Sequence, residues 1–284
     1  MVTPSFNQAR FLEEAIRSVL DQNYANLEYF VIDGGSTDGS VEIIRKYQQR
    51  LTGWLSEPDQ GQYHAINKGF DRTSGEIMGW LNSDDKHMPW TLHVVGEIFN
   101  GFPDVQWLTT LFPTALGEDG HPSNLRSVDG YSRDAFWRGA NLPGRGWFAE
   151  DFIQQEATFW RRSLWDRCGA KLDLSLKHAA DFELWARFFA QGAELHGVLI
   201  PLGGFRLHNQ QKTALIFEEY CREAEAVLRR SGGRPFSRSE TWWLQKTRDI
   251  MEHFKRKYWR RLALKDRCPK IYRLRGAWEL HRGP

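Results

Sequence analysis

The sequence predicts an α/β protein with a mostly parallel sheet covered by helices. Over residues 1 to about 110, short apolar runs typical of strands alternate with patterns of helical period. Acidic residues follow the strand runs at Asp33, at Glu57 and Asp59, and at Asp84 and Asp85. Because ligands bind beyond the carboxyl ends of the strands in such sheets, we expect these loops to lie along one functional edge.

The elements follow from local patterns. Phe11, Leu12, Ala15 and Ile16 share one helical face. The expected elements are a strand ending near Thr3-Pro4, a helix from Ala9 to Asp21, a strand from Leu27 to Ile32, a helix capped by Asp38 or Ser40, a strand at Trp54 to Ser56, a helix from Gln60 to Phe70, a strand from Ile77 to Leu81 and a helix opening at Pro89. The first strand has few residues before its end, so either it is clipped or the native chain begins upstream.

The second half is less regular. Residues 111–150 mix Gly, Pro and aromatic residues without a clear period, which indicates a long loop that is either functional or mobile. Residues 154–209 are expected to be compact, with a helix around Asp181 and a strand from Leu195 to Leu202, and helical patterns resume after Gln210. We therefore predict a domain over residues 1–212, in halves of 1–110 and 111–212, and a helical extension over residues 213–284.

Composition bounds the class of protein. The 284 residues are 41% hydrophobic and 26% charged, as in globular proteins with a substantial core. The 13 tryptophans suit an aromatic core, and some could stack on bases or sugars. The three cysteines, Cys168, Cys221 and Cys268, show no CxxC spacing, which argues against a disulfide framework or a zinc site. No apolar run long enough for a membrane span and no signal peptide are recognised, so we expect a cytoplasmic protein.

Charge is unevenly distributed along the chain. Residues 241–284 hold 13 Lys and Arg against 4 Asp and Glu, whereas residues 1–240 carry about −7. In the basic part, Ile250, Phe254, Tyr258 and Leu262 would form one helical stripe. Two interpretations remain open: peripheral contact with an anionic membrane at the inner face of the cell membrane, or a helix packed on the domain with a solvated basic face. No recognised module supports binding to nucleic acid.

The segment Asn82-Ser83-Asp84-Asp85 is the most informative. Two adjacent carboxylates at a strand end repel one another unless a cation compensates them. Hard oxygen ligands suit Mg²⁺ or Mn²⁺ that also coordinates a substrate diphosphate. The alternative is that these residues only serve as turn and cap residues.

A set of ordered motifs resembles the inverting family-2 glycosyltransferases of the GT-A fold. The motifs are Thr3 to Asn7, Val31 to Ser40, Ser56 to Gly61, Ala65 to Gly69, Gly75 to Ile77 with Asn82 to Asp85, Phe159 to Arg162, Ala180 to Trp185 and Phe205 to His208. The resemblance covers residues 1 to about 212. It implies a Rossmann-like GT-A domain with a nucleotide-binding half (1–110) and an acceptor-side half (111–212).

The resemblance also implies roles for individual residues. Donor contacts would come from Thr3, Pro4, Ser5, Asp33, Asp59, Asn67, Lys68, Ser83, Asp84 and Arg206. Asp84, Asp85 and His208 would hold Mn²⁺ or Mg²⁺, with Asp85 the more direct ligand. Asp181 would be the general base, with a helix cap as its alternative role. Gly34 stands where many relatives have an acidic base contact, so that contact would shift to Asp33 or Asp59, although Asp33 could be a turn residue.

The implied activity is a metal-dependent inverting glycosyltransferase of the hexosyltransferase type. It would move a sugar from a nucleotide-diphosphate donor, UDP first and GDP or dTDP as alternatives, to a saccharide or lipid-linked acceptor in surface polysaccharide synthesis. A catalytically silent nucleotide-sugar or glycan binding protein on the same scaffold is the alternative. A glycoside hydrolase is disfavoured, because adjacent Asp84 and Asp85 do not flank a sugar with carboxyl groups about 5–9.5 Å apart.

Overall fold

A computed structural model describes residues 1–142, 152–208, 212–235, 237, 240, 268–274 and 276–282. The first half contributes three parallel strands in the order β1 (Val2–Ser5), β2 (Phe30–Asp33) and β3 (Gly53–Ser56). Val2 also pairs in parallel with Trp80, which follows β4 (Ile77–Met78) and joins this sheet to the second half. The α/β prediction is confirmed, and this half has the parallel pairing that was expected.

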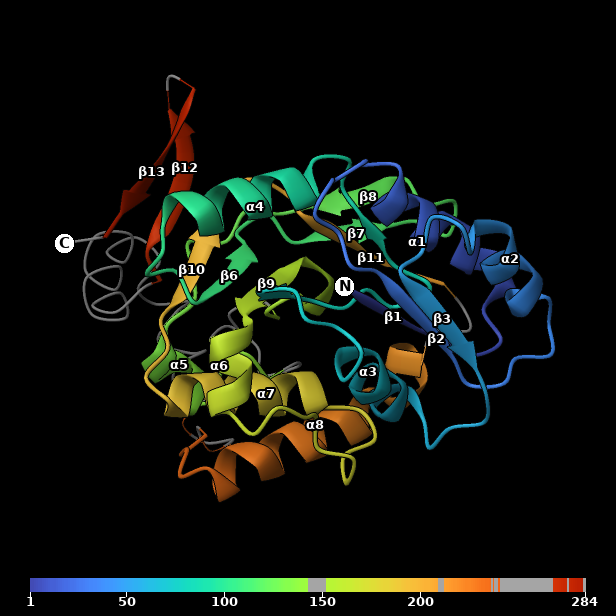
Figure 1. Ribbon diagram of the computed structural model, residues 1–284. Helices are drawn as coiled ribbons and strands as arrows, with labels where there is room; N and C mark the ends of the chain where they lie inside the picture. The colour runs from blue at the N-terminus through green and yellow to red at the C-terminus, as the bar shows by residue number, and fades with distance from the viewer. Residues whose placement is uncertain are drawn as a thin grey trace.

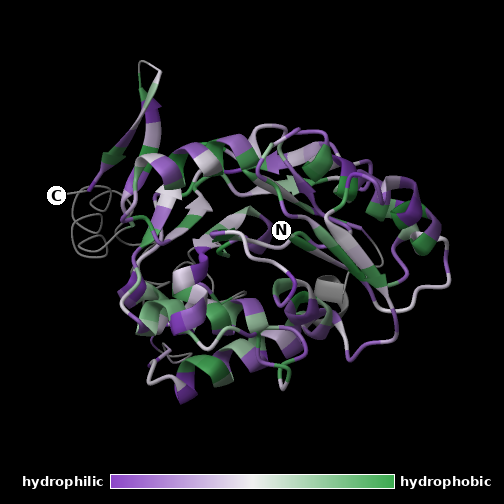
Figure 2. Ribbon diagram, viewed as in Figure 1, coloured by the Kyte–Doolittle hydropathy of each residue, from purple (hydrophilic) through white to green (hydrophobic). Residues whose placement is uncertain are grey.

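Helices cover the first sheet as the periodicity predicted. They are α1 (Ala9–Leu20), α2 (Ser40–Tyr47) and α3 (Gln62–Phe70), whereas α4 (Thr91–Gly101) packs mainly on strands of the second half. Helix α1 buries the predicted face, including Phe11, Leu12 and Ile16. The colours of α1 and α2 alternate between hydrophobic and hydrophilic in Figure 2, as expected for helices with one face in the core.

The second half adds a mixed sheet rather than a parallel one. Its order is β13 (Ala277–His281), β12 (Lys270–Leu274), β10, β6, β9 and β4. Strand β6 (Trp107–Thr110) runs parallel to β10 (Leu195–Val198), whereas β9 (Thr158–Arg161) is antiparallel to both β6 and β4. Helices α6 (Arg162–Arg167) and α7 (Ala180–Ala190) follow in this half.

A small four-stranded sheet lies beside the main one. Its order is β5 (Lys86–His87), β11 (Gly203–Arg206), β7 (Thr114–Leu116) and β8 (Pro122–Leu125). The prediction of an irregular chain over residues 111–150 was wrong for β7, for β8 and for α5 (Arg133–Trp137). All four residues of β8 are exposed, so the strand has no apolar alternation by which the sequence could reveal it.

The C-terminal region combines a helix and a hairpin. Helix α8 (Lys212–Arg230) lies along α7 (Figure 1). Strands β12 (Lys270–Leu274) and β13 (Ala277–His281) form a hairpin that projects from the sheet edge (Figure 1), where a helical extension was expected. The stripe from residue 250 to 262 lies outside the described residues. None of the helices in the described part of the chain has the length and apolar character needed to cross a bilayer.

Tryptophans form the centre of the core. Trp80, Trp107, Trp160 and Trp185 are all buried. The Trp185 ring stacks on Trp107 with centroids 5.3 Å apart and on Trp80 at 6.3 Å, and Trp160 meets Trp80 and Trp185 edge to face. The prediction of an aromatic core is confirmed for these four, and they join β6 and β9 to helix α7.

Candidate functional site

Asp85 anchors the acidic loop to strand β11. Its side chain is 1% exposed. Oδ1 accepts a hydrogen bond from the Arg206 backbone N–H at 2.9 Å, and Oδ2 accepts one from the Asn82 side-chain amide at 3.1 Å. Burial raises the pKa of Asp85 well above its usual range, and the charges of Asp84 and Glu156 add to this effect.

Asp84 points away from this anchor. Its side chain is 21% exposed, and Oδ2 lies 3.1 Å from Nε2 of His208. The His208 ring packs on Phe11, and its buried Nδ1 has no hydrogen-bond partner among the described residues. The structure therefore brings together Asp84 and His208 of the predicted metal residues. Each Asp85 oxygen accepts one hydrogen bond inside the protein, which gives the residue a role within the loop, and its expected role as the more direct ligand stays a prediction.

The Asp84–His208 pair fits a divalent cation shared with a substrate. A carboxylate oxygen and an imidazole nitrogen are donor types that Mn²⁺ accepts, and the carboxylate also suits Mg²⁺. No group of three or more His, Cys, Asp or Glu that could hold a metal occurs among the described residues. A site with few protein ligands leaves coordination positions for the phosphate oxygens of a nucleotide.

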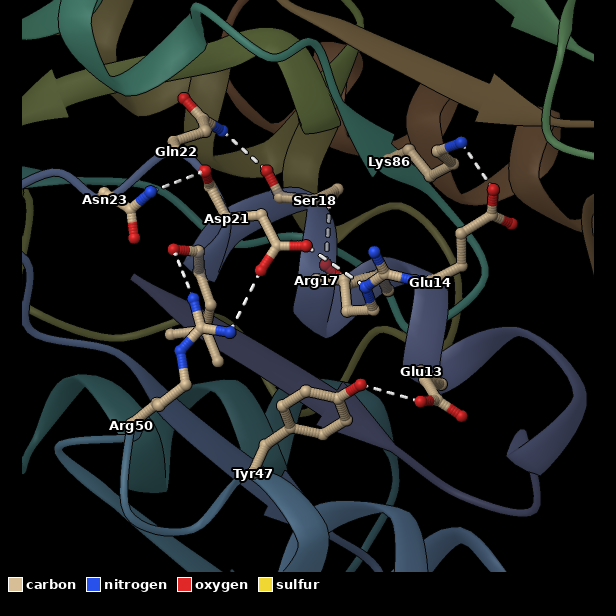
Figure 3. Close-up of polar contacts among 12 residues, drawn as sticks. Glu13, Glu14, Arg17, Ser18, Asp21, Gln22, Asn23, Tyr47, Arg50 and Lys86 are labelled. Carbon is tan, nitrogen blue, oxygen red and sulfur yellow. Dashed lines mark hydrogen bonds and ion pairs between the residues drawn. The ribbon is translucent and has the colours of Figure 1, made fainter.

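Arg206 supports the acidic loop instead of contacting a donor. The residue is 1% exposed, and its guanidinium donates to the backbone oxygens of Asp84 at 2.6 Å and Glu118 at 2.8 Å, and to Oε2 of Glu14 at 2.5 Å. Glu14 also accepts from Lys86, which Figure 3 shows reaching it from the side. The prediction that Arg206 binds the donor is corrected: its burial and these bonds assign it to positioning Asp84.

Asp33 organises the loop that follows β2. Its carboxylate is fully buried and accepts from the backbone N–H groups of Gly35 at 3.1 Å and Ser36 at 2.9 Å. It also accepts from the hydroxyls of Ser36 at 2.5 Å and Ser56 at 2.7 Å. With four donors already on its oxygens, Asp33 has the turn role that the sequence left as an alternative.

Asp59 lies next to the position of the expected base contact. Its Oδ1 accepts from the Gly61 backbone N–H at 2.7 Å, and the residue is partly exposed. A Cβ added to Gly34 would lie only 2.9 Å from Oδ2 of Asp59. Of the two candidates for the displaced base contact, Asp59 is therefore the one with a carboxylate facing the loop at Gly34.

The β1 residues predicted to contact the donor are inside the sheet. Thr3, Pro4 and Ser5 are buried. The Thr3 hydroxyl lies 2.8 Å from the hydroxyl of Tyr29, which gives it a partner within the fold. The Ser5 hydroxyl oxygen is at the carboxyl end of the strand and has no hydrogen-bond partner among the described residues. Of these three, Ser5 is the one placed to meet a ligand.

Two residues of helix α3 also bind other parts of the protein. The Asn67 amide pairs with the Leu172 backbone in both directions, at 3.1 and 2.8 Å, so it joins α3 to the loop before α7. The Lys68 ammonium lies 2.6 Å from Oε1 of Glu57. Ser83, in the acidic loop, is 5% exposed. These contacts account for Asn67 without a donor, and the roles of Lys68 and Ser83 stay predictions.

Asp181 faces a cavity of about 510 Å³ beside the acidic loop. Asn82 of that loop lines the same cavity, as does Tyr220 of α8, whose hydroxyl lies 3.4 Å from Oδ1 of Asp181. Ala179 occupies the N-cap position of α7, so the structure does not support the cap role for Asp181. Burial raises the pKa of Asp181 to about 6, although hydrogen bonds from the first helical turn and from Tyr220 lower it in part.

The N-terminus of α7 is held by an acidic residue from another helix. Oε2 of Glu223, on α8, accepts from the backbone N–H groups of His178 at 2.9 Å and Ala179 at 3.1 Å. A carboxylate at a helix N-terminus is favourable, because it satisfies unpaired N–H groups and complements the helix dipole. Helix α8 thus supplies two residues around Asp181, although the sequence placed it in a separate extension.

Sequence reasoning also missed Glu156. It lies in a 3₁₀ turn, Gln155–Ala157, directly before β9 and lines the cavity with Asp181. The residue is 3% exposed, and burial raises its pKa to about 8. The dipeptide Gln155-Glu156 precedes the motif that begins at Phe159 but belongs to no motif itself. Apart from this closeness to Phe159, nothing in the sequence indicated that an acid is buried here.

Comparisons with known proteins agree with this geometry. A family model described as glycosyl transferase family 2 matches residues 1–149, which is more than half of the chain. The putative teichuronic acid biosynthesis glycosyltransferase TuaG of Bacillus subtilis is 35% identical over 89 residues, 30% of this chain and 35% of its own length. The chain spans about a third of the length of the curated relatives that it matches first.

Two solved structures share the fold. TarS of S. aureus, in complex with UDP-GlcNAc, has a TM-score of 0.62 and 15% identity, covering 93% of this chain and 75% of that one. The mannosyltransferase PcManGT of Pyrobaculum calidifontis, in complex with GDP-Man and Mn²⁺, has a TM-score of 0.54 and 16% identity, covering 91% and 81%. At such identities the likeness establishes the fold alone, which is GT-A. Together with the family match, it follows that this chain is a member of glycosyl transferase family 2.

Proposed function

We propose that the chain is a metal-dependent inverting glycosyltransferase. It would move a sugar from a nucleotide-diphosphate donor to a saccharide or lipid-linked acceptor. The observation that carries this proposal is that Asp181 and Asn82 line one cavity, while Asp84 and His208 converge on the same loop. The candidate base thus lies in a cavity that Asn82 of the acidic loop also lines, and two candidate ligands for a diphosphate-bound cation meet at that loop.

The donor side of the proposal rests on Asp84, His208 and Asp59. Asp84 and His208 would hold Mn²⁺ or Mg²⁺, which when bound neutralises the charge of the leaving diphosphate and contributes several kcal/mol. Asp59 would accept hydrogen bonds from the nucleoside, as carboxylates do. UDP is our first choice, with GDP or dTDP as alternatives, since TarS is seen with UDP-GlcNAc and PcManGT with GDP-Man and Mn²⁺.

The acceptor side rests on Asp181. In an inverting transfer the acceptor oxygen bonds to the anomeric carbon as the bond to the diphosphate breaks, and the acceptor hydroxyl gives up its proton. Asp181 would accept that proton. Its pKa of about 6 lies closer to neutral pH than that of an ordinary aspartate, which suits a general base, and such a base contributes roughly 10²–10⁴-fold in rate.

A role in surface polysaccharide synthesis is the finer part of the proposal. It is supported by the likeness to TuaG, whose name assigns it to teichuronic acid biosynthesis. The acceptor in such a pathway is a growing glycan or a lipid-linked sugar.

The first experiment screens UDP-, GDP- and dTDP-sugars with Mn²⁺ or Mg²⁺, following thermal stabilisation and release of the nucleoside diphosphate. We expect one donor class to stabilise the protein in a metal-dependent way and to be consumed with an acceptor. If no donor gives a metal-dependent response, the proposal fails. Binding without any transfer would favour the silent binding protein instead.

The second experiment replaces the base. Asp181→Asn should lower the transfer rate by about 10²–10⁴-fold and leave the dissociation constant of the donor unchanged. Glu183→Gln is a matched control on the same helix, because Glu183 pairs with Arg187 and is not among the residues that line the cavity. An active Asp181→Asn variant would refute the assignment of the base.

A further inference from the structure

Glu156 is a buried acid whose carboxyl group is only partly paired within the fold. Its Oε1 has no hydrogen-bond partner among the described residues, although the residue is 97% buried. A buried carboxyl oxygen without a partner costs free energy in the folded state, since it loses water without gaining another hydrogen bond. In the wall of a cavity, such a group can be paired by a bound ligand.

The backbone around Glu156 is held in place from two sides. The side-chain amide of Gln155 donates to the backbone oxygen of Trp80 at 2.6 Å. On the other side, strand β11 packs directly on the turn: a Cβ added to Gly203 would lie 2.5 Å from the Glu156 backbone oxygen and 3.1 Å from its Cγ. The position of the carboxyl group is therefore set by the fold, as a binding group requires.

Two other residues that line the cavity also have a buried polar atom without a partner. Oε1 of Gln155 and Nε1 of Trp80 are buried and have no hydrogen-bond partner among the described residues, and both residues line the same cavity. An acceptor, a donor and a carboxyl oxygen thus belong to three residues that line one cavity. Buried polar groups in proteins are nearly always hydrogen-bonded, so three together point to a polar ligand in this place.

Resting on the proposed function, we infer that Glu156 binds a hydroxyl group of a sugar in the cavity and thereby positions that sugar for transfer. The hydroxyl belongs either to the sugar being transferred or to the acceptor sugar. Glu156 is a positioning residue and selects among sugars, whereas Asp181 handles the proton. It should discriminate against sugars that lack this hydroxyl, because their binding leaves the buried carboxyl group unpaired.

The protonation state of Glu156 suits this role. Burial raises the pKa of Glu156 to about 8, and the negative charges of Asp181 and Asp84 add to the effect. Burial therefore favours the carboxylic acid form, which can donate one hydrogen bond and accept another. A sugar hydroxyl also does both, so the two groups are complementary.

Two variants test the inference. Glu156→Met removes both hydrogen-bonding functions at similar length, and Glu156→Gln keeps a donor and an acceptor. For each variant, the dissociation constants of UDP and of UDP-GlcNAc are measured with Mn²⁺, together with the KM of the acceptor and kcat. The free energy of unfolding in urea is followed in parallel, and we expect Glu156→Met to be at least as stable as the wild type because it removes an unpaired buried group.

If the hydroxyl belongs to the transferred sugar, Glu156→Met should raise the dissociation constant of UDP-GlcNAc about tenfold and leave that of UDP unchanged. If it belongs to the acceptor, both nucleotides should bind normally while the KM of the acceptor rises about tenfold. In either case Glu156→Gln should retain most of the affinity.

Unchanged binding and kinetics in Glu156→Met, or equal weakening of UDP and UDP-GlcNAc, would overturn the inference. So would a Glu156→Gln variant as defective as Glu156→Met. A wild-type protein that binds no nucleotide with Mn²⁺ would instead refute the proposed function, so the two failures are distinguishable.

Discussion

The carboxylate of Asp59 lies where it would meet the Cβ of any side chain at position 34, which is Gly34 in this chain. A Cβ at position 34 would approach Oδ2 of Asp59 to 2.9 Å, closer than unbonded atoms normally come. The two positions therefore compete for one space, so an acidic side chain at 34 and the present placement of Asp59 exclude each other. Glycine at 34 leaves the nucleoside side of the loop to Asp59.

Gly34→Asp should weaken UDP binding, measured with Mn²⁺ by calorimetry, by about tenfold or more, because the new carboxylate meets Asp59 sterically and electrostatically. The double variant Gly34→Asp/Asp59→Ala should recover part of that loss, with a coupling energy of about 0.5–3 kcal/mol. Gly101→Asp is the control, since a Cβ there meets nothing within 4 Å. Strictly additive effects of the two substitutions would mean that the residues do not compete.

Substitutions of Asp84 and Asp85 should affect different quantities, nucleotide binding for Asp84 and stability for Asp85. Asp84→Ala should abolish most Mn²⁺-dependent UDP binding with little change in the free energy of unfolding, because its side chain is partly exposed. Asp85→Ala should lower the free energy of unfolding by about 1–3 kcal/mol, because it leaves the buried Arg206 N–H unpaired. Calorimetry and urea unfolding measure both quantities. A larger loss of Mn²⁺ affinity in Asp85→Ala than in Asp84→Ala would contradict this division.

The pH dependence of transfer should report the burial of Asp181. Its pKa is raised to about 6, so the carboxylate that acts as base is lost as the pH falls through about 6. We expect kcat/KM to decline below that pH and so to form an acidic limb in the pH profile. This limb should lie about two pH units above the one expected for a base with the pKa of an ordinary aspartate. In the wild type the hydrogen bond from the Tyr220 hydroxyl lowers the pKa of Asp181. Tyr220→Phe removes this bond, so the pKa should rise and the decline of kcat/KM should move to higher pH. A limb near pH 4 in the wild type would argue against Asp181 as base.

Glu223→Gln should affect both stability and the pH profile. The neutral amide is a weaker acceptor for the backbone N–H groups of His178 and Ala179, so we expect a loss of about 1 kcal/mol in urea unfolding. The charge of Glu223 raises the pKa of Asp181, so the acidic limb should shift to lower pH, opposite to Tyr220→Phe. Glu218→Gln, exposed on the same helix, is the control and should change neither quantity.

Strong periodicity made the first half predictable. The apolar face of α1, the short strands and the acidic loops needed only local patterns, and the structure has all of them. The edge strand β8 was not predicted, because it buries no side chain and its sequence therefore lacks an alternation of apolar and polar residues. In β13, Trp278 and Leu280 do alternate with exposed residues, so its period of two could have been recognised against the basic composition that suggested a helix.

Individual roles were harder to predict than elements. The motifs identified Asp84, His208 and Asp181 as candidates, and the structure pairs Asp84 with His208 and puts Asp181 in a cavity that Asn82 of the same acidic loop lines. They could not separate a carboxylate that faces a ligand from one that holds a loop, as Asp33 and Asp85 do, because that depends on which backbone N–H groups reach each oxygen. Glu156 and Tyr220 were missed because their importance comes from burial beside residues distant in sequence.

The placement of α8 has a consequence for how relatives are compared. The family match ends at residue 149, whereas Glu156, Asp181, Tyr220 and Glu223 all come later in the chain. Under the proposed function, two relatives can share the region that handles the nucleotide and still differ in the region that receives the sugar. Similarity confined to the first half is therefore a guide to the donor, and the choice of acceptor must be read from the helices that follow it.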